Sequence, residues 1–223
     1  MAIAFDASTI SNIGSTPSTV TISFTVGNNS NRGLIVSVSN NSITSSAIAS
    51  VTFNGIAFTS IRRDVGTLGS GMGTIESFYL IAPEVGTYNV VVTQGATKSS
   101  YITTVIGSYY GVAQASSIDV SNYKEYATDA SYSISATTTT DNTWGVIGAF
   151  SQRGISASTN TTARSGSGTG SFIGDTNGAQ TPAGSKSMAL TISESPWSTW
   201  GHVLFIKPYV TSTNNGAGFF ILM

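Results

Sequence analysis

The sequence predicts an all-β protein, a two-sheet antiparallel sandwich of about ten strands with no substantial helix. Apolar and polar residues alternate with a period of two, as from Val20 to Val26, and this period indicates strands with one buried face. Segments rich in Gly, Asn, Ser and Pro separate the alternating runs. No window of ten or more residues keeps the 3.6-residue period of a helix.

The strands are expected in order along the chain. The clearest local signal is Asn54-Gly55 in VTFNGIAFTSI, which predicts a two-residue type I′ hairpin because both turn residues must take positive φ. In TTTTDNTWGVIGAF, Asp141-Asn142 predicts a turn and Trp144 a core residue. The expected strands lie within residues 20–26, 33–39, 51–61, 74–82, 87–93, 100–110, 131–139, 142–150, 186–193 and 200–208.

The arrangement expected for these strands is a jelly roll. Long irregular loops at 64–73 and 151–185 favour two packed sheets, although composition alone does not separate this fold from a closed barrel. A chain of 223 residues with 40% hydrophobic content is long enough for one domain with a full core.

Charge excludes several classes of partner. Charged residues make up 9% of the chain, against about 25% in an average soluble domain. The net charge of -1 provides no basic field for phosphates, so nucleic acid is not expected as a partner. Arg62-Arg63, the one adjacent basic pair, is interpreted as protection of an edge strand.

No apolar run is long enough for a membrane helix. The absence of cysteine excludes disulfides and thiolate chemistry.

Residues that could carry catalysis are few, and we expect no enzyme. The single histidine, His202, lies in the apolar strand WGHVLFIKP, where a partly buried histidine with satisfied hydrogen bonds is favoured over a general base. Glycoside hydrolysis needs two carboxylates about the scissile bond. Among the glutamates, which are Glu76, Glu84, Glu125 and Glu194, Glu76 alone is placed in a strand that could face a cleft.

No metal site or cofactor is expected either. The stretch GDTNG at 174–178 is similar to the first half of a calcium loop, but it lacks the later bidentate glutamate. A turn is therefore the preferred interpretation of this stretch.

A series of motifs carries a resemblance to a known module. The chain contains, in order, the Asn-Gly hairpin, YLIAPEVG before a Val-rich strand, GVAQ, TTTDNTW, and WGHVLFIKP at the end. This order resembles the concanavalin-like jelly-roll domains of phage virion proteins and bacterial extracellular proteins, over roughly residues 18–208. The resemblance implies the concanavalin-like form of the jelly roll and carries no catalytic signature.

The first function expected from this resemblance is that of a bacteriophage virion structural protein, a capsid decoration, cement or head-fibre subunit. It would be made in the host cytoplasm without a signal peptide and displayed on the capsid surface, with capsid or other virion proteins and copies of itself, in a trimer, as partners. The expected organisation is an N-terminal arm at 1–17, a jelly-roll domain at 18–208 and an apolar tail at 209–223. Apolar termini either add strands to their own sheets or dock on a neighbour. The residues assigned to docking are Phe5, Phe219, Phe220, Ile221 and Leu222.

The second expected function is carbohydrate binding, as a lectin-like module that adheres to host or mucus glycans. Aromatic rings suit the apolar face of a sugar, and nearby amides and carboxylates suit its hydroxyls. The residues assigned to this platform are Tyr110, Tyr123, Tyr126 and Trp197. Because Tyr109 and Tyr110 point to opposite faces of one strand, one of the two is expected in the core.

Overall fold

The chain is built from antiparallel sheets. The computed structural model describes residues 1–14, 17–40, 48–66, 73–95, 101–126, 130–193 and 199–211. These ranges contain sixteen strands and no helix, so the predicted all-β sandwich class is confirmed. The strands form three sheets, where the sequence predicted about ten strands in two.

A five-stranded central sheet has the order β1-β9-β3-β7-β6. All eight residues of β3 are buried, because other sheets cover the central sheet on both faces. Its strands are β1 (Ala4–Gly14), β3 (Gly33–Asn40), β6 (Thr59–Val65), β7 (Thr74–Ile81) and β9 (Tyr101–Tyr110).

A four-stranded outer sheet, β2-β8-β4-β5, covers one face of the central sheet. In β2 the exposed and buried residues alternate strictly, so Val20, Ile22 and Phe24 enter the core while the intervening threonines and serine face solvent. Both residues of the Asn54-Gly55 turn have positive φ, at 48° and 78°, as a type I′ hairpin requires. The strands are β2 (Thr19–Val26), β4 (Ile48–Phe53), β5 (Ile56–Ala57) and β8 (Gly86–Gln94).

A seven-stranded sheet, which we call the folded sheet, covers the other face of the central sheet. Its long strand β12 pairs with β16 and β14 and then, from Ile155 to Ala157, with β15. The sheet thereby folds over a core of its own. Its strands are β10 (Ile118–Tyr126), β11 (Ser131–Thr138), β12 (Trp144–Ala157), β13 (Thr162–Ser165), β14 (Thr169–Asp175), β15 (Gly184–Ile192) and β16 (Thr199–Ile206).

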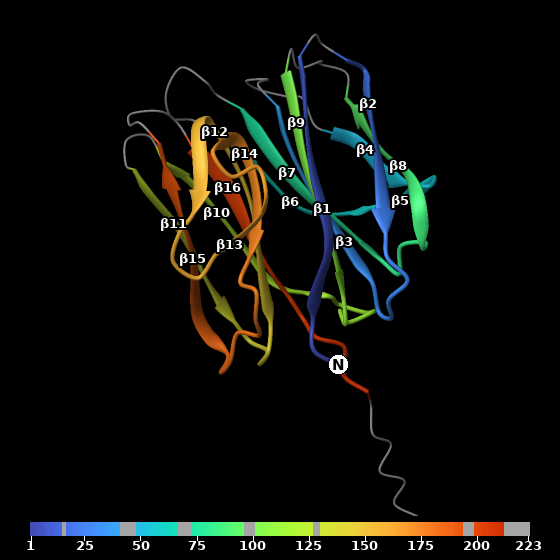
Figure 1. Cartoon of the computed structure of the whole chain (residues 1–223), viewed down its shortest axis with the longest axis vertical. Coiled ribbons are helices and arrows are strands. Elements are labelled where there is room, and N and C mark those ends of the chain that lie inside the picture. Colours follow the sequence, from blue (N-terminus) through green and yellow to red (C-terminus); the bar gives the residue numbers. More distant parts are fainter. Residues whose placement is uncertain are drawn as a thin grey trace, which may run out of the picture.

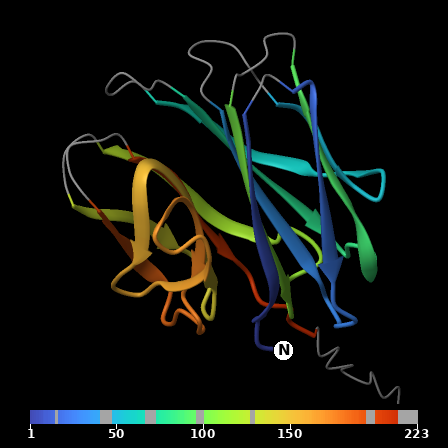
Figure 2. The same ribbon diagram turned by 45° about the horizontal axis from the view of Figure 1, so that its top comes forward.

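The resulting body has two halves that lie side by side (Figure 1). The outer and central sheets form one half, and the folded sheet forms the other, as the rotated view also shows (Figure 2). Three apolar clusters hold the layers together: one between the outer and central sheets, one between the two halves, and one inside the folded sheet. The middle cluster draws residues from both halves and so packs them against each other.

The N-terminal segment, expected to be an arm, is the edge strand of the central sheet. Strand β1 pairs with β9 from Ala4 to Gly14. Phe5, assigned to subunit docking, packs edge-on against Tyr109 with ring centroids 5.9 Å apart. The N-terminus thus adds a strand to its own sheet, which is one of the two alternatives left open by the sequence.

Both described ends of the chain lie at one pole of the body (Figure 1). The Met1 ammonium group donates a hydrogen bond to the carbonyl oxygen of Tyr209 over 3.0 Å. The backbone N–H of Tyr209 donates to the carbonyl oxygen of Gly111 over 2.7 Å. The remaining docking residues, Phe219, Phe220, Ile221 and Leu222, lie outside the described residues.

Candidate functional site

A histidine, two serines, an aspartate and an arginine form a hydrogen-bonded chain between the two halves. His202 on β16 has Nδ1 2.8 Å from Ser77 Oγ on β7 and Nε2 3.0 Å from Asp64 Oδ2 on β6. Ser77 Oγ lies 2.7 Å from Oγ of Ser37, its register partner on β3. Arg62 donates two hydrogen bonds to Asp64, of 2.6 and 2.9 Å. We call these five residues the histidine cluster.

The chemistry of these groups fixes the direction of the hydrogen bonds. An ionised carboxylate can accept but cannot donate, so His202 Nε2 carries the proton and donates to Asp64. Nδ1 of the neutral ring then accepts from the Ser77 hydroxyl. Since the Ser77 proton is used, Ser37 donates to Ser77 Oγ. Every member of the chain therefore has a defined partner.

Burial and charge set the protonation states of the cluster. Burial of His202 lowers its pKa below the ordinary value of 6.5, and the bond to Asp64 offsets part of this effect, so the ring is neutral at pH 7. Desolvation raises the pKa of Asp64, but the hydrogen bonds from His202 and Arg62 outweigh it and hold that pKa well below its usual range. The carboxylate is therefore ionised.

A serine, a histidine and an aspartate in contact are the elements of a nucleophilic triad, so access decides their role. In the triads of hydrolases the serine oxygen faces a substrate, and a hole of N–H donors faces the developing oxyanion. Here Ser77 and His202 have no exposed surface, and Ser37 is 2% exposed. Ser77 Oγ is directed at Ser37 and His202, which leaves no approach for a substrate carbonyl carbon. The arrangement connects β3, β6 and β7 of the central sheet to β16 of the folded sheet.

Sequence reasoning missed this cluster. It predicted correctly that His202 is hydrogen-bonded, but it expected a partly buried ring, and the ring is fully buried. Nothing in the sequence brings residues 37, 64, 77 and 202 together. The available signal was that Ser37 and Ser39 alternate with valines in β3, which normally indicates a solvent face. The folded sheet covers that face, so the serines became interior hydrogen-bonding groups.

A second buried ionic group lies at the end of β14. Asp175 has no exposed surface and accepts hydrogen bonds from Arg164 Nε and NH2, of 2.7 and 2.8 Å. The Asn177 backbone N–H also donates to the carboxylate, and Asn177 has a positive φ of 48°. The GDTNG stretch is thus a turn held by an arginine, as preferred from the sequence. Among the residues that the structure describes, no group of three or more His, Cys, Asp or Glu side chains could hold a metal ion.

Glu76, the strand glutamate considered for catalysis, points inward. Its carboxylate accepts a hydrogen bond from the Ile48 backbone N–H over 2.9 Å and lies 3.3 Å from Arg63 Nε. Burial raises the pKa of Glu76, and these two partners oppose the rise. The side chain fastens the start of β4 to β7 and faces no cleft.

The residues assigned to a glycan platform do not form one surface in the described part of the chain. Tyr110 is half-buried at the end of β9 in the central sheet, whereas Tyr123 lies on β10 in the folded sheet. Tyr123 packs edge-on against His202, with ring centroids 5.7 Å apart. The side chain of Tyr126 and the whole of Trp197 lie outside the described residues. Tyr109 is fully buried, so the expected core member of the Tyr109-Tyr110 pair is confirmed.

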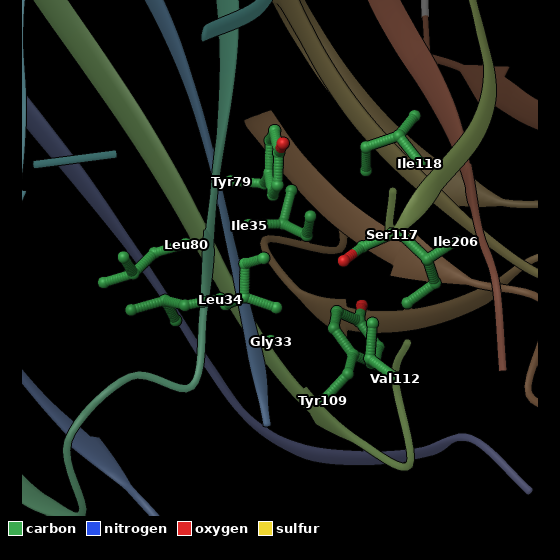
Figure 3. A pocket seen from close by; sticks show the side chains of 11 residues that line it. Gly33, Leu34, Ile35, Tyr79, Leu80, Tyr109, Val112, Ser117, Ile118 and Ile206 are labelled. Carbon is green, nitrogen blue, oxygen red and sulfur yellow. The ribbon is translucent and has the colours of Figure 1, made fainter. Parts of the chain in front are cut away.

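The two halves also meet in a close apolar contact (Figure 3). Side chains from the central sheet, including Ile35 and Tyr79, face Ile118 and Ile206 of the folded sheet there. The cavity left among them is about 10 Å³, which is room for at most one water molecule. This contact is packing and no ligand site.

Two outward faces of the body are rich in exposed hydroxyl groups. On the outer sheet, β2 exposes one such residue at every second position, and Thr25 Oγ1 lies 2.8 Å from Thr87 Oγ1 on β8. On the folded sheet, Ser133 Oγ lies 2.6 Å from Ser187 Oγ across β11 and β15. The exposed hydroxyl residues of these four strands are Thr19, Thr21, Ser23, Thr25, Thr87, Ser131, Ser135, Thr137, Ser185, Ser187 and Thr191. We call these surfaces the hydroxyl faces.

Comparisons with protein-family models, with curated proteins and with solved structures found no match. Within the described ranges, no helix is long and apolar enough to cross a membrane. Geometry and chemistry are therefore the basis for assigning a function.

Proposed function

We propose that this chain is a structural protein of a bacteriophage particle, a capsid decoration, cement or head-fibre subunit that acts through contacts with copies of itself and with other virion proteins. The observation that carries this proposal is the pair of hydroxyl faces. Burying an ion in an interface costs several kcal/mol, roughly, unless it is paired. An uncharged hydroxyl surface can be covered by a neighbour without that cost, and its groups can exchange water for hydrogen bonds.

The buried ionic groups support the same function. The one histidine and its serine partner are fully buried between the halves, and the partly exposed Asp64 completes this connection between the sheets. The remaining surface is suited to contact, and no described residue set is arranged for covalent chemistry on a substrate. The capsid surface of a virion is the location that we propose, as expected from the motif order.

Solution mass tests this proposal. Light scattering of the full chain is compared with a version truncated after Thr211, which keeps both hydrogen bonds of Tyr209. We expect a trimer of the 23.0 kDa chain that loses mass on truncation. The control is Thr21→Arg, which places a charge in the centre of one hydroxyl face: it separates assembly through that face from assembly through residues 212–223. A chain that is monomeric at all concentrations, alone and with purified virion proteins, would refute the proposal.

Adhesion to host or mucus glycans is the second candidate function. An uncharged groove at the junction of the two halves favours it, and a virion decoration protein could combine both roles. The groove differs in place from the tyrosine and tryptophan platform expected from the sequence.

A further inference from the structure

A polar groove of about 350 Å³ lies where the edges of the central and folded sheets meet. Five strands besides β3 contribute to it: β1, β9, β12, β14 and β16. Its volume falls within the range of about 300–1,000 Å³ that is usual for small-molecule sites. We call it the seam groove, and its principal lining residues are Asn12, Ser39, Tyr101, Ser151, Ser171 and Trp200.

The polar groups of the seam groove are held in place by bonds that leave further capacity. Ser39 Oγ accepts a hydrogen bond of 2.8 Å from Trp200 Nε1, so its own hydroxyl hydrogen is still a donor. Ser151 Oγ accepts from Thr199 Oγ1 over 3.0 Å and from the Arg153 backbone N–H, and it likewise keeps a hydroxyl hydrogen. These fixed oxygens are preorganised, because their positions are set by bonds within the protein.

An amide at the rim adds donors of a second kind. Asn12 Oδ1 accepts a hydrogen bond of 2.8 Å from Ser171 Oγ, so its Nδ2 hydrogens are the groups left for another partner. The side chain of Asn12 is exposed, whereas Ser171 is buried. Ser171 Oγ in turn keeps acceptor capacity. The groove therefore combines donors and acceptors within one small volume.

Aromatic side chains supply the apolar surface. Phe150 and Trp200 line the groove and are almost fully buried, which gives it a rigid apolar part. Tyr101 is 42% exposed, so part of its side chain is open to a ligand. Aromatic surface beside hydrogen-bonding groups matches a pyranose, which has an apolar face of C–H groups and a rim of hydroxyls.

We propose that the seam groove binds a neutral saccharide, of about one or two pyranose rings for its volume. None of the described residues that line the groove is charged, so phosphates, carboxylates and cations would lose their hydration there without a compensating ion pair from this lining. A neutral ligand with many hydroxyls loses no such charge solvation. This inference deepens the second candidate function, because it names the ligand class and the site for adhesion.

Binding is tested with amide-resolved NMR titrations of the full chain, using N,N′-diacetylchitobiose, lactose and maltose as probes and inorganic phosphate as the anionic control. A printed panel of neutral and acidic glycans extends the search. We expect a neutral sugar to shift the amides of Tyr101, Ser151 and Ser171, and phosphate to shift none of them.

Variants then locate the site. Tyr101→Ala removes the exposed ring, and Gln152→Trp places a large side chain at an exposed lining position; each is expected to weaken sugar binding at least tenfold. The matched control is Tyr110→Ala, a tyrosine of the same strand outside the groove, which should leave binding unchanged. Urea midpoints within the wild-type range show that each variant is folded.

Three outcomes would overturn the inference: no response to any neutral glycan, loss of binding in Tyr110→Ala with retention in Tyr101→Ala, or equal binding of phosphate. These results are independent of the solution mass. A trimer that binds no sugar would support the virion proposal and refute sugar binding in the seam groove. A monomer that binds sugar would refute the virion proposal and support sugar binding.

Discussion

Removal of the His202 side chain tests whether the histidine cluster fastens the two halves together. In His202→Ala, Ser77 loses the acceptor for its hydroxyl and Asp64 loses one of its donors. Leaving a buried hydroxyl without its partner costs about 1–3 kcal/mol. The space of a fully buried imidazole adds about 2 kcal/mol as a cavity. The free energy of unfolding should therefore fall by about 3–5 kcal/mol.

The assay is equilibrium urea unfolding followed by tryptophan fluorescence. Trp144 and Trp200 are buried in the cluster between the halves, so their emission reports the loss of this contact. The slope of the free energy of unfolding against urea concentration must be the same in the wild type and the variant, which shows that both expose the same surface on unfolding. Ser37→Ala is the matched control: it removes the terminal donor of the chain and should cost about 1 kcal/mol.

The pH dependence separates a hydrogen-bonding role from simple packing. Because burial lowers the folded-state pKa of His202 below 6.5, the unfolded chain binds more protons as the pH falls below that value. The stability from neutral His202 is present above pH 6.5 and is lost as the pH falls. Glu76 has a raised pKa and acts with the opposite sign, so the useful quantity is the difference between wild type and His202→Gln.

That difference should shrink as the pH falls from about 7.5 to about 5.5, by at most about 1.4 kcal/mol, because the unfolded chain gains a proton on His202 more readily than the folded protein does. The reasoning is refuted if His202→Ala lowers the free energy of unfolding by less than about 1 kcal/mol, because the histidine cluster would then contribute little to stability. It is equally refuted by parallel pH profiles of wild type and His202→Gln, since the buried ring would then titrate as it does in the unfolded chain.

Three further substitutions probe the same contact between the halves. Phe5→Ala removes a ring whose centroid lies 4.3 Å from Arg164 Cζ, and it should lower the free energy of unfolding by about 2–4 kcal/mol. Light scattering should show an unchanged mass; a change of mass with unchanged stability would instead support subunit docking. Asp175→Ala leaves Arg164 unpaired against a buried site and should cost about 3–5 kcal/mol in urea unfolding, and a cost below about 1 kcal/mol would contradict the pairing. Gly148→Ala brings a Cβ within 2.8 Å of Ser37 Oγ, so it should cost about 1–3 kcal/mol, and the cost should decrease in a Ser37→Gly background if the clash is its cause.

The predicted strands include strands with a strict period of two, such as β2, and strands that are buried on both faces, such as β3 and β16. Strand β2 alternates because one face meets the core and the other meets water. The Asn54-Gly55 turn was predictable because positive φ at two successive residues restricts the choice of amino acids. Trp144 was predictable as a core residue from its size and its position in an apolar run, and it is 7% exposed.

The strands that were missed lack this alternation for a physical reason. Most residues of β1 are partly exposed on both faces, because the strand lies at an edge and is covered incompletely by its neighbours. Strand β14 is buried over Ser171 to Asp175 but contains two glycines, which reduce its strand signal. The folded sheet was not predicted as a separate sheet, because its strands β10, β13 and β14 lie in segments that were interpreted as loops.

The candidate sites could be predicted less well than the fold. Aromatic residues were selected from the sequence by type, but exposure depends on which sheet covers them, and Tyr123 packs against His202. The seam groove draws its residues from six strands spread between Asn12 and Trp200. No local spacing in the sequence encodes such a site, because it arises where two separately paired sheets meet.

The placement of charge connects the fold with the proposed functions. The chain has 19 charged residues among 223, of which 9 are basic and 10 are acidic. Three ion pairs use six of them: Arg62 with Asp64 within β6, Arg63 with Glu76 between β6 and β7, and Arg164 with Asp175 between β13 and β14. These six charges thus act within single sheets, whereas the described residues that line the seam groove are uncharged. In both proposals recognition would rest on hydrogen bonds and apolar contact, which salt screens far less than it screens the attraction between ions.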